Sequence, residues 1–358
     1  MVIGSPGEIK TEEYRVGLIP EMCAYLVSRK HTVIIETGAG EGAGFPDDEY
    51  LKAGARIVNS AEEVYSQAHL IVKVKEPQKS EIPLLHKEQI LFTFFHFSSN
   101  PEMTEMLAGK KVNCIAYELV EEDGILPILK PMSEIAGKLS IQQGMKYLEK
   151  EYGGKGVLLP PIEAVRGGRV LVIGGGTVGA SAAVVACGVG AEVTIIERNP
   201  ERIRQLSTIF PAARVLESRP ETIRESIART DIIVGAVLVP GHRTPVLVSK
   251  SDLALIEPGT VLVDVSIDEG GIFETSRPTT HKNPVFIESG IVHYCVPNIP
   301  GVVPKTSTLA LSYATGRYLP LLAEKGIDAC NESAPLAKGL AIRNGEIVNK
   351  DIAAALDH

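Results

Sequence analysis

The sequence lacks the cysteine patterns of disulfide-stabilised and zinc-binding proteins. Its cysteines are odd in number and widely separated, and no C-x-x-C pair occurs among Cys23, Cys114, Cys187, Cys295 and Cys330. Small secreted domains use even sets of cysteines for disulfides, and structural zinc sites use paired thiols. We therefore expect reduced thiols, a reducing compartment and no metal site.

Long runs of one residue class are also missing. The chain has no stretch of about 18 consecutive apolar residues, which a membrane-spanning helix needs. Its N-terminus does not join basic residues to a long apolar segment, as a secretory signal does. It has no run of Lys and Arg, and its formal net charge is -8, which argues against nucleic-acid binding. We expect a cytoplasmic protein with a small-molecule substrate and no membrane or nucleic-acid partner.

The sequence does contain enough apolar material for two domains. The chain has 358 residues, of which 44% are apolar, and this length exceeds the usual size of one domain. Short β-branched runs alternate with helical patterns, as in parallel sheets with crossover helices. Strands are expected at residues 2–3, 31–36, 69–75, 89–97, 112–118, 169–173, 192–196, 231–235 and 260–265, and helices at 18–29 and 133–152. The expected fold class is α/β, with two Rossmann-like domains on doubly wound parallel sheets.

The strongest local signal is a glycine-rich turn between a strand and a helix. The apolar strand at 169–173 leads directly into G-x-G-x-x-G, formed by Gly174, Gly176 and Gly179, and a helix of small residues follows. In dinucleotide-binding folds these glycines permit a tight turn, close approach of a pyrophosphate, and close packing of helix and strand. The helix N-terminus adds N–H donors and the positive end of a dipole. The pattern therefore predicts a dinucleotide site.

The next predicted strand ends at an acidic residue, Glu197. A carboxylate at this position accepts hydrogen bonds from the adenosine ribose and repels the 2′-phosphate of NADP. The neighbouring Arg198 is a residue type that accommodates such a phosphate. Because of the carboxylate, we expect the cofactor to be NAD.

A second glycine-rich stretch, residues 38–44, is interpreted as a connector. It runs into Phe45 and Pro46, a Pro-led helix start, and it has no glycine at the third position of the fingerprint.

Several segments, in a fixed order, resemble the alanine dehydrogenase family, which shares a superfamily with the NAD-binding part of proton-translocating transhydrogenase. Together they span nearly the whole chain. The segments are 7–10 (GEIK), 13–16 (EYRV), 74–77 (VKEP), 95–97 (FHF), 131–137 (PMSEIAG), 235–241 (GAVLVPG), 263–271 (VDVSIDEGG), 277–280 (RPTT), 296–300 (VPNIP) and 304–308 (PKTST).

The resemblance implies a discontinuous architecture. Residues 1–128 and 305–358 would form the catalytic domain, an NAD-binding Rossmann domain at 129–304 would be inserted between them, and the active site would lie in the interdomain cleft. The implied reaction is the reversible oxidative deamination of L-alanine to pyruvate and ammonium, with hydride transfer to NAD. The family usually forms a homo-oligomer, a hexamer.

The family motifs also assign two substrate-binding residues. Arg15 would hold the substrate carboxylate through its planar, bidentate fork, although a solvated surface arginine is the simpler interpretation without the family. Lys75, at the end of the predicted strand 69–75, would contact the substrate. By strand alternation it faces the same side as Lys73, and an edge-strand lysine that aids solubility is the alternative.

Two further residues would be catalytic. His96 lies at the end of an aromatic run, before a helix cap at Ser98, Ser99 and Asn100. It would exchange protons near neutrality, since the ordinary histidine pKa is about 6.5; a buried structural histidine is the alternative. Asp268 follows the strand at 260–265 and would orient or activate water, although it could also serve only as a turn residue.

The expected cofactor contacts combine the glycine fingerprint with residues that the family implies. They are Ser133, Gly174, Gly176, Thr177, Val178, Gly179, Glu197, Arg202, Ser218, Val237, Leu238, Val265, Ser266, Ile267, Asp268, Val296, Pro297, Asn298 and Ile299.

The chain departs from the family pattern at three places, and these keep other functions open. Phe95 replaces a frequent tyrosine, Glu269 replaces glutamine in Asp-Gln-Gly-Gly, and Pro297 with Ile299 replace the outer residues of Ala-Asn-Met. One alternative is a related amino-acid or imine dehydrogenase with a larger substrate, of the lysine or saccharopine type. Others are an NAD-binding transhydrogenase component and a non-enzymatic NAD-sensing domain.

Overall fold

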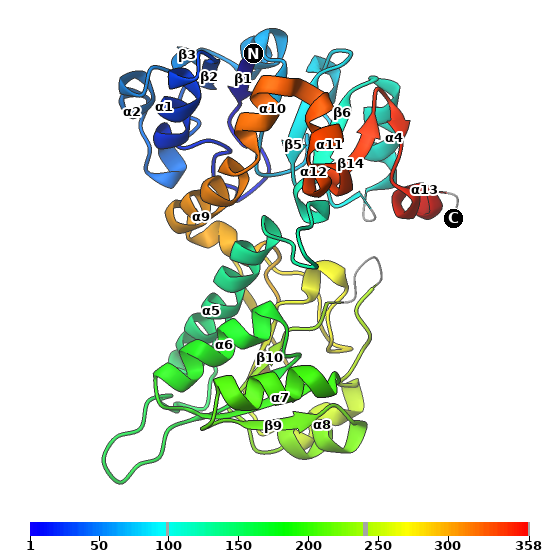
Figure 1. Ribbon diagram of the computed structural model, residues 1–358. Coiled ribbons are helices and arrows are strands. Elements are labelled where there is room, and N and C mark those ends of the chain that lie inside the picture. The colour runs from blue at the N-terminus through cyan, green and yellow to red at the C-terminus, as the bar shows by residue number, and fades with distance from the viewer. Residues whose placement is uncertain (98–99, 239–242, 357–358) are drawn as a thin grey trace. The chain divides into compact units, whose positions relative to one another are not determined.

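The computed structural model describes residues 1–97, 100–238 and 243–356. The predicted cap residues Ser98 and Ser99 and the motif residues 239–241 lie outside these ranges. The chain divides into two compact units, Met1–Met132 together with Gly301–His358, and Ser133–Pro300 (Figure 1).

The first unit is built on one sheet with the strand order β3-β2-β1-β4-β5-β6-β14-β15 in the described part of the chain. The strands are β1 (Val2–Ser5), β2 (Thr32–Glu36), β3 (Arg56–Val58), β4 (Leu70–Val72), β5 (Ile90–Thr93), β6 (Asn113–Ala116), β14 (Leu340–Arg343) and β15 (Glu346–Ile347). The helices are α1 (Pro20–Ser28), α2 (Asp47–Lys52), α3 (Ala61–Gln67), α4 (Pro101–Gly109), α9 (Pro304–Gly316), α10 (Leu319–Lys325), α11 (Ala329–Glu332), α12 (Ala334–Gly339) and α13 (Lys350–Leu356). Leu91 and Cys114 of neighbouring strands pack with Tyr65 of α3 and Leu107 of α4 in a buried apolar core.

The second unit has the strand order β12-β13-β11-β10-β7-β8-β9. The strands are β7 (Arg169–Ile173), β8 (Glu192–Glu197), β9 (Arg214–Glu217), β10 (Ile232–Gly235), β11 (Val261–Asp264), β12 (Val285–Glu288) and β13 (Ile291–Tyr294). The helices are α5 (Leu129–Tyr147), whose first turn belongs to the first unit, α6 (Thr177–Gly188), α7 (Pro200–Ile209) and α8 (Pro220–Ile227). Leu171, Ile196, Ile233 and Leu262 supply a core from four adjacent strands.

Both sheets reverse their winding direction beside their first strand. In the first unit the chain moves outward from β1 through β2 and β3, then returns to β4 on the other side; β7, β8, β9 and β10 repeat this course. This confirms the predicted doubly wound α/β fold. In such sheets ligands bind at the carboxyl ends of the strands, beside the point of reversal.

The sheets are not parallel throughout, which the sequence analysis did not predict. β14 and β15 add to β6 in antiparallel fashion, and β12 pairs antiparallel with β13. These strands lie at sheet edges and arise from short hairpins or returning segments, whereas the predicted pattern counted only strands that alternate with helices.

Several predicted elements have different ends. β4 ends at Val72, where the carboxylate of Glu8 accepts the backbone N–H groups of Val74 (2.6 Å) and Lys75 (3.3 Å). β5 ends at Thr93, so the predicted strand 89–97 is too long. The predicted helix 133–152 is shifted: α5 begins four residues earlier, at Leu129, and ends at Tyr147.

Candidate functional site

The glycine turn after β7 has the geometry that a bound pyrophosphate requires. Gly174 has a φ of 103°, and a Cβ there would collide with the carbonyl oxygen of Ala236. A Cβ at Gly179 would collide with the carbonyl oxygen of Gly174. At Gly176, by contrast, a Cβ would meet no described atom within 4 Å, so the start of α6 faces open space. This cradle fits the dinucleotide that the sequence predicts.

The end of β8 is tied to this turn. The carboxylate of Glu197 accepts the N–H of Gly175 at 2.7 Å, and its other oxygen accepts the N–H groups of Arg198 and Asn199. Arg202 donates through Nε to the carbonyl of Gly175 (2.8 Å), and the N–H of Ser218 binds the carbonyl of Glu197. The predicted cofactor residues Glu197, Arg202 and Ser218 therefore lie at one sheet end.

The loops after β10 and β11 are joined at the same sheet end. The hydroxyl of Ser266 donates to the carbonyl of Val237 (2.8 Å) and accepts its N–H (3.0 Å). Asp268 lies on a short 3-10 turn, η7 (Ile267–Glu269), is exposed, and accepts the N–H of Asn298 at 3.4 Å. The structure thus brings together loop residues that are distant in sequence.

The remaining predicted cofactor contacts belong to the same unit. Ser133 lies on α5, one helical turn before Gly137, whose Cβ would collide with the carbonyl oxygen of Val178 at the start of α6. Thr177 and Leu238 are exposed, whereas Val296 and Ile299 are buried. Val265 and Pro297 are half-buried, and Val265 donates its N–H to Gly235 at the end of β10.

Arg15 is buried, which excludes the interpretation as a solvated surface arginine. It is 3% exposed, and Glu13 accepts from its Nε and Nη2 atoms, while Nη1 contacts the sulfur of Met132 at 3.2 Å. The terminal edge of the fork, made of Nη1 and Nη2, has the two-donor geometry that matches a carboxylate.

Lys73 and Lys75 have different surroundings, and neither is an edge-strand lysine, because β4 lies between β1 and β5. Lys73 is 1% exposed and pairs with Glu81 (2.8 Å) and Glu8 (3.3 Å). Burial lowers its pKa, but these two carboxylates outweigh burial and raise it, so Lys73 stays charged within a structural cluster. Lys75 is also buried, and its charge acts on His96.

His96 lies beyond β5 in a left-handed backbone conformation, with a φ of 52°. Its N–H and that of Phe95 are accepted by the carboxylate of Glu118, at 2.7 Å and 3.1 Å, and its ring stacks on Phe94. Burial, followed by the charge of Lys75, lowers the pKa of His96 to about 3. The imidazole is therefore neutral at physiological pH, which corrects the expectation of an ordinary pKa near 6.5.

Sequence reasoning missed the acidic residues that hold these groups in position. Glu13 binds Arg15, Glu118 binds the His96 backbone, and Asp264 organises the loop that carries Asp268. Asp264 is fully buried and accepts from Ser266, Ile272 and Ser276. The sequence offered one signal that could have identified Glu118 and Asp264: both are acidic residues at the ends of predicted apolar strands.

The residues predicted to bind the substrate and those predicted to bind the cofactor belong to different units. Arg15, Lys75 and His96 lie in the first unit, whereas Asp268 and the glycine turn lie in the second.

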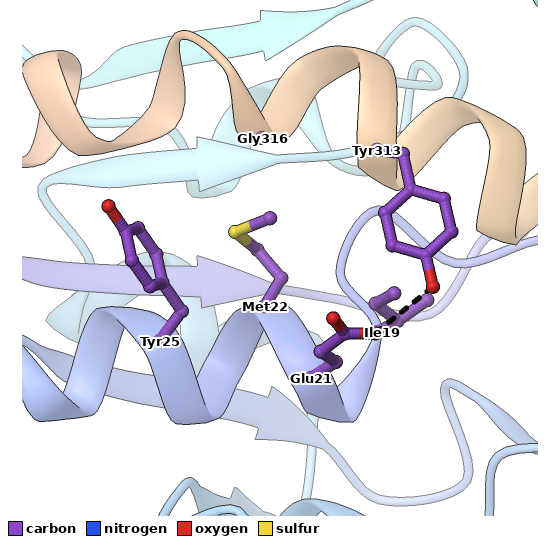
Figure 2. Close-up of a pocket in the computed structure, with 6 residues that line it drawn as sticks. All are labelled: Ile19, Glu21, Met22, Tyr25, Tyr313 and Gly316. Atoms are coloured by element: carbon purple, nitrogen blue, oxygen red, sulfur yellow. Dashed lines mark hydrogen bonds between the residues drawn. The ribbon is translucent and has the colours of Figure 1, made fainter.

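A pocket elsewhere in the first unit contains none of these residues. It lies between α1 and α9 and is lined by Ile19, Glu21, Met22, Tyr25, Tyr313 and Gly316 (Figure 2). Tyr313 donates to Glu21 at 3.0 Å, and Gly316 allows close packing because a Cβ there would collide with the end of Met22. Its lining offers no cation for a carboxylate.

Residues 1–97, 100–238 and 243–356 contain neither a membrane-spanning helix nor a metal-binding cluster. No helix in these ranges combines the length and hydropathy needed to cross a bilayer. No group of three or more His, Cys, Asp or Glu side chains in these ranges could hold a metal ion.

The chain matches two domain families over most of its length. Residues 4–136 match the family described as alanine dehydrogenase/PNT, N-terminal domain, and residues 140–350 match the corresponding C-terminal domain. An alanine dehydrogenase from Methanococcus maripaludis is 46% identical over 361 residues, covering 100% of this chain and 97% of that protein. One from Mycolicibacterium smegmatis is 44% identical over 362 residues, covering 100% of this chain and 97% of that protein.

Solved structures are similar to this chain over nearly its whole length. A structure named L-alanine dehydrogenase is similar with a TM-score of 0.96 and 45% identity, covering 100% of this chain and 99% of the other. A transhydrogenase from Sinorhizobium meliloti shares the fold, with a TM-score of 0.84 and 24% identity over 98% of this chain and 99% of that chain.

Proposed function

Because the chain belongs to the alanine dehydrogenase/PNT family, we propose that it is an NAD-dependent L-alanine dehydrogenase. The reaction converts L-alanine, NAD⁺ and water into pyruvate, ammonium, NADH and a proton, and it is reversible. We assign substrate binding to the first unit, with predicted bounds 1–128 and 305–358, and NAD binding to the second, with predicted bounds 129–304.

The observation that carries this proposal is the set of charges around His96. Besides burial, the charges of Lys75, Lys10 and Arg15 lower the pKa of its imidazole, and the charge of the neighbouring Glu76 opposes them. A neutral base therefore lies beside cations that attract a carboxylate. A 2-oxo or 2-amino acid has this carboxylate beside the carbon that reacts. Arg15 would hold it by its fork, and Lys75 would contact the adjacent oxygen.

Each catalytic group has one task in the proposed mechanism. NAD, when bound, accepts the hydride of the alanine Cα, and the residues from Gly174 to Gly179 with Glu197 would hold its pyrophosphate and ribose. His96 would take up and return protons at its imidazole nitrogen. Asp268 would orient the water that attacks the resulting iminium carbon.

A panel of amino acids assayed for NAD reduction tests the proposal. We expect the highest kcat/KM with L-alanine. A higher kcat/KM with a larger amino acid would identify that amino acid as the substrate in place of alanine and would leave the reaction class unchanged. Absence of reduction with every amino acid would favour the transhydrogenase-component or NAD-sensing alternatives.

We further propose a cytoplasmic homo-oligomer, with the hexamer as the size that the family implies. Three exposed apolar side chains support self-association. Ile162 and Val165 are 56% and 68% exposed and close a turn by their backbone bridge, and Leu158, which precedes this turn, is 58% exposed. Light scattering should show an oligomer, and replacing Ile162 and Val165 by serine should lower its mass. A monomeric unmodified protein would contradict the proposal.

A further inference from the structure

The carboxylate of Glu76 contains an oxygen that is buried and has no partner. The residue is 7% exposed, and its Oε1 accepts from the ammonium of Lys10 at 2.5 Å and from the amide of Gln78 at 3.4 Å. Its Oε2 has no hydrogen-bond partner in the described part of the chain. Buried polar atoms are nearly always satisfied, and an unsatisfied one is costly, more so when it is charged.

The Glu76 side chain belongs to the charged group around His96. Glu76 follows Lys75 directly, and its charge acts on the imidazole together with those of Lys75 and Lys10. Burial alone would raise the pKa of Glu76, but the hydrogen bond and charge of Lys10 and the charge of Lys75 outweigh burial and lower it. Glu76 is therefore an anion within a group of cations.

We propose that Glu76 binds the nitrogen of the substrate, with Oε2 accepting a hydrogen bond from the α-ammonium of the amino acid and from the iminium that replaces it. The inference rests on the proposed function. An amino acid is a zwitterion, and Arg15 and Lys75 match its carboxylate only. A second, anionic group is needed for the ammonium, and the oxygen left unsatisfied in the protein is such a group.

The role has a consequence for specificity. Pyruvate carries the carboxylate but no nitrogen, so it does not use Glu76. Ammonium and L-alanine both carry the nitrogen and therefore use Glu76. Glu76 thus distinguishes a 2-amino acid from the 2-hydroxy acid of the same size, because a hydroxyl donates a weaker, uncharged hydrogen bond.

The decisive variant is Glu76→Gln, which keeps the size of the side chain and removes its charge. In reductive amination the KM for ammonium should rise about 10- to 100-fold, the usual effect of losing one charge-assisted hydrogen bond. The KM for pyruvate should stay unchanged. Glu102→Gln is the matched control: it makes the same change at an exposed carboxylate that pairs with Lys79, outside the charged group around His96, so the KM for ammonium should stay close to that of the unmodified enzyme.

Several outcomes would overturn the inference. An unchanged KM for ammonium in Glu76→Gln, or an equal rise in the KM values for pyruvate and ammonium, would show that Glu76 does not recognise the nitrogen. The same ammonium defect in Glu102→Gln would show that the effect is not specific to Glu76. If Glu76→Gln does not fold, as judged by circular dichroism, Glu76→Asp tests the same difference between the KM values for ammonium and pyruvate. Aspartate keeps the negative charge, but its side chain is one methylene shorter, which moves the carboxylate away from the nitrogen. Failure of the proposed function is seen separately, as absence of alanine-dependent NAD reduction by the unmodified protein.

Discussion

The guanidinium of Arg15 is held by the carboxylate of Glu13 through two hydrogen bonds, from Nε to Oε1 at 2.7 Å and from Nη2 to Oε2 at 2.5 Å. Both side chains are buried. The pair fixes the plane of the fork, so its terminal edge points in a constant direction. A ligand carboxylate then needs no rearrangement of the arginine, which favours binding.

Arg15→Lys should impair pyruvate reduction although it conserves the charge. A lysine ammonium cannot satisfy Glu13 and a substrate carboxylate in the same planar arrangement. We expect kcat/KM for pyruvate to fall about 10- to 100-fold, the effect of one lost charge-assisted hydrogen bond. Arg29→Lys is the control, because Arg29 makes an exposed ion pair with Glu324. A variant with full kcat/KM would exclude Arg15 as a substrate ligand.

Glu197→Ser should weaken the preference for NAD over NADP. Like charges about 4 Å apart repel by ~1 kcal/mol in water and ~4 kcal/mol near a protein surface, so the ratio of the two kcat/KM values should fall about tenfold or more. Glu217→Ser, at the end of the next strand, serves as the control. Equal kcat/KM for NAD and NADP in the unmodified protein would defeat the assignment of this role to Glu197.

His96 should stay reactive toward diethyl pyrocarbonate, which acylates neutral imidazole, from about pH 8 to pH 5, where an ordinary histidine of pKa about 6.5 becomes protonated. The reason is its pKa of about 3, caused first by burial and then by Lys75. Peptide mass spectrometry measures the modification, with exposed His86 as the internal reference. If the modification of His96 instead declined with a midpoint near pH 6.5, as expected for an ordinary histidine, this result would contradict the lowered pKa.

The same shift makes a prediction about folding. Between about pH 6.5 and pH 3 the unfolded chain binds a proton at His96 that the folded chain does not bind. Protonation therefore favours the unfolded state, and His96 contributes a loss of stability as the pH falls through this window. Urea unfolding should show a smaller pH dependence in His96→Gln than in the unmodified protein.

The family and the fold class could both be predicted from the sequence, because their signals are local and ordered along the chain. The glycine fingerprint consists of adjacent residues, and its strand and helix are β7 and α6 in the structure. The motifs around Arg15, Lys75 and His96 likewise identified the family, which the matches to both domain families confirm.

The partners of these residues could not be predicted, because they depend on contacts between distant segments. Glu118 is far from His96 in sequence and meets it only because β5 and β6 are neighbours. The lowered pKa of His96 arises from burial and from the charges around the folded imidazole, which no periodicity reveals. Strand ends were misjudged at β4 and β5 for a related reason, since Glu8 and Glu118 bind backbone groups just beyond them.

His96 and Asp268 are the two groups that we propose to be catalytic. His96→Ala and Asp268→Asn should each lower kcat for alanine deamination by at least about a hundredfold, since positioned proton transfer contributes ~10²–10⁴-fold. His86→Ala and Glu225→Gln, both at exposed positions, are the matched controls and should keep full turnover. The measurement is kcat beside a fluorescence titration with NADH.

The titration separates chemistry from binding. The cradle from Gly174 to Gly179 includes neither residue, so both variants should bind NADH and remain folded. A variant that loses NADH affinity together with kcat would show that its residue acts in cofactor binding rather than in catalysis. Near-normal turnover in either variant would remove that residue from the mechanism. Asp268 is exposed and accepts the N–H of Asn298 at a long 3.4 Å, a hydrogen bond that the oxygen of an asparagine can also accept. Its replacement by asparagine should therefore leave that loop intact, so a fall in kcat would report the lost charge.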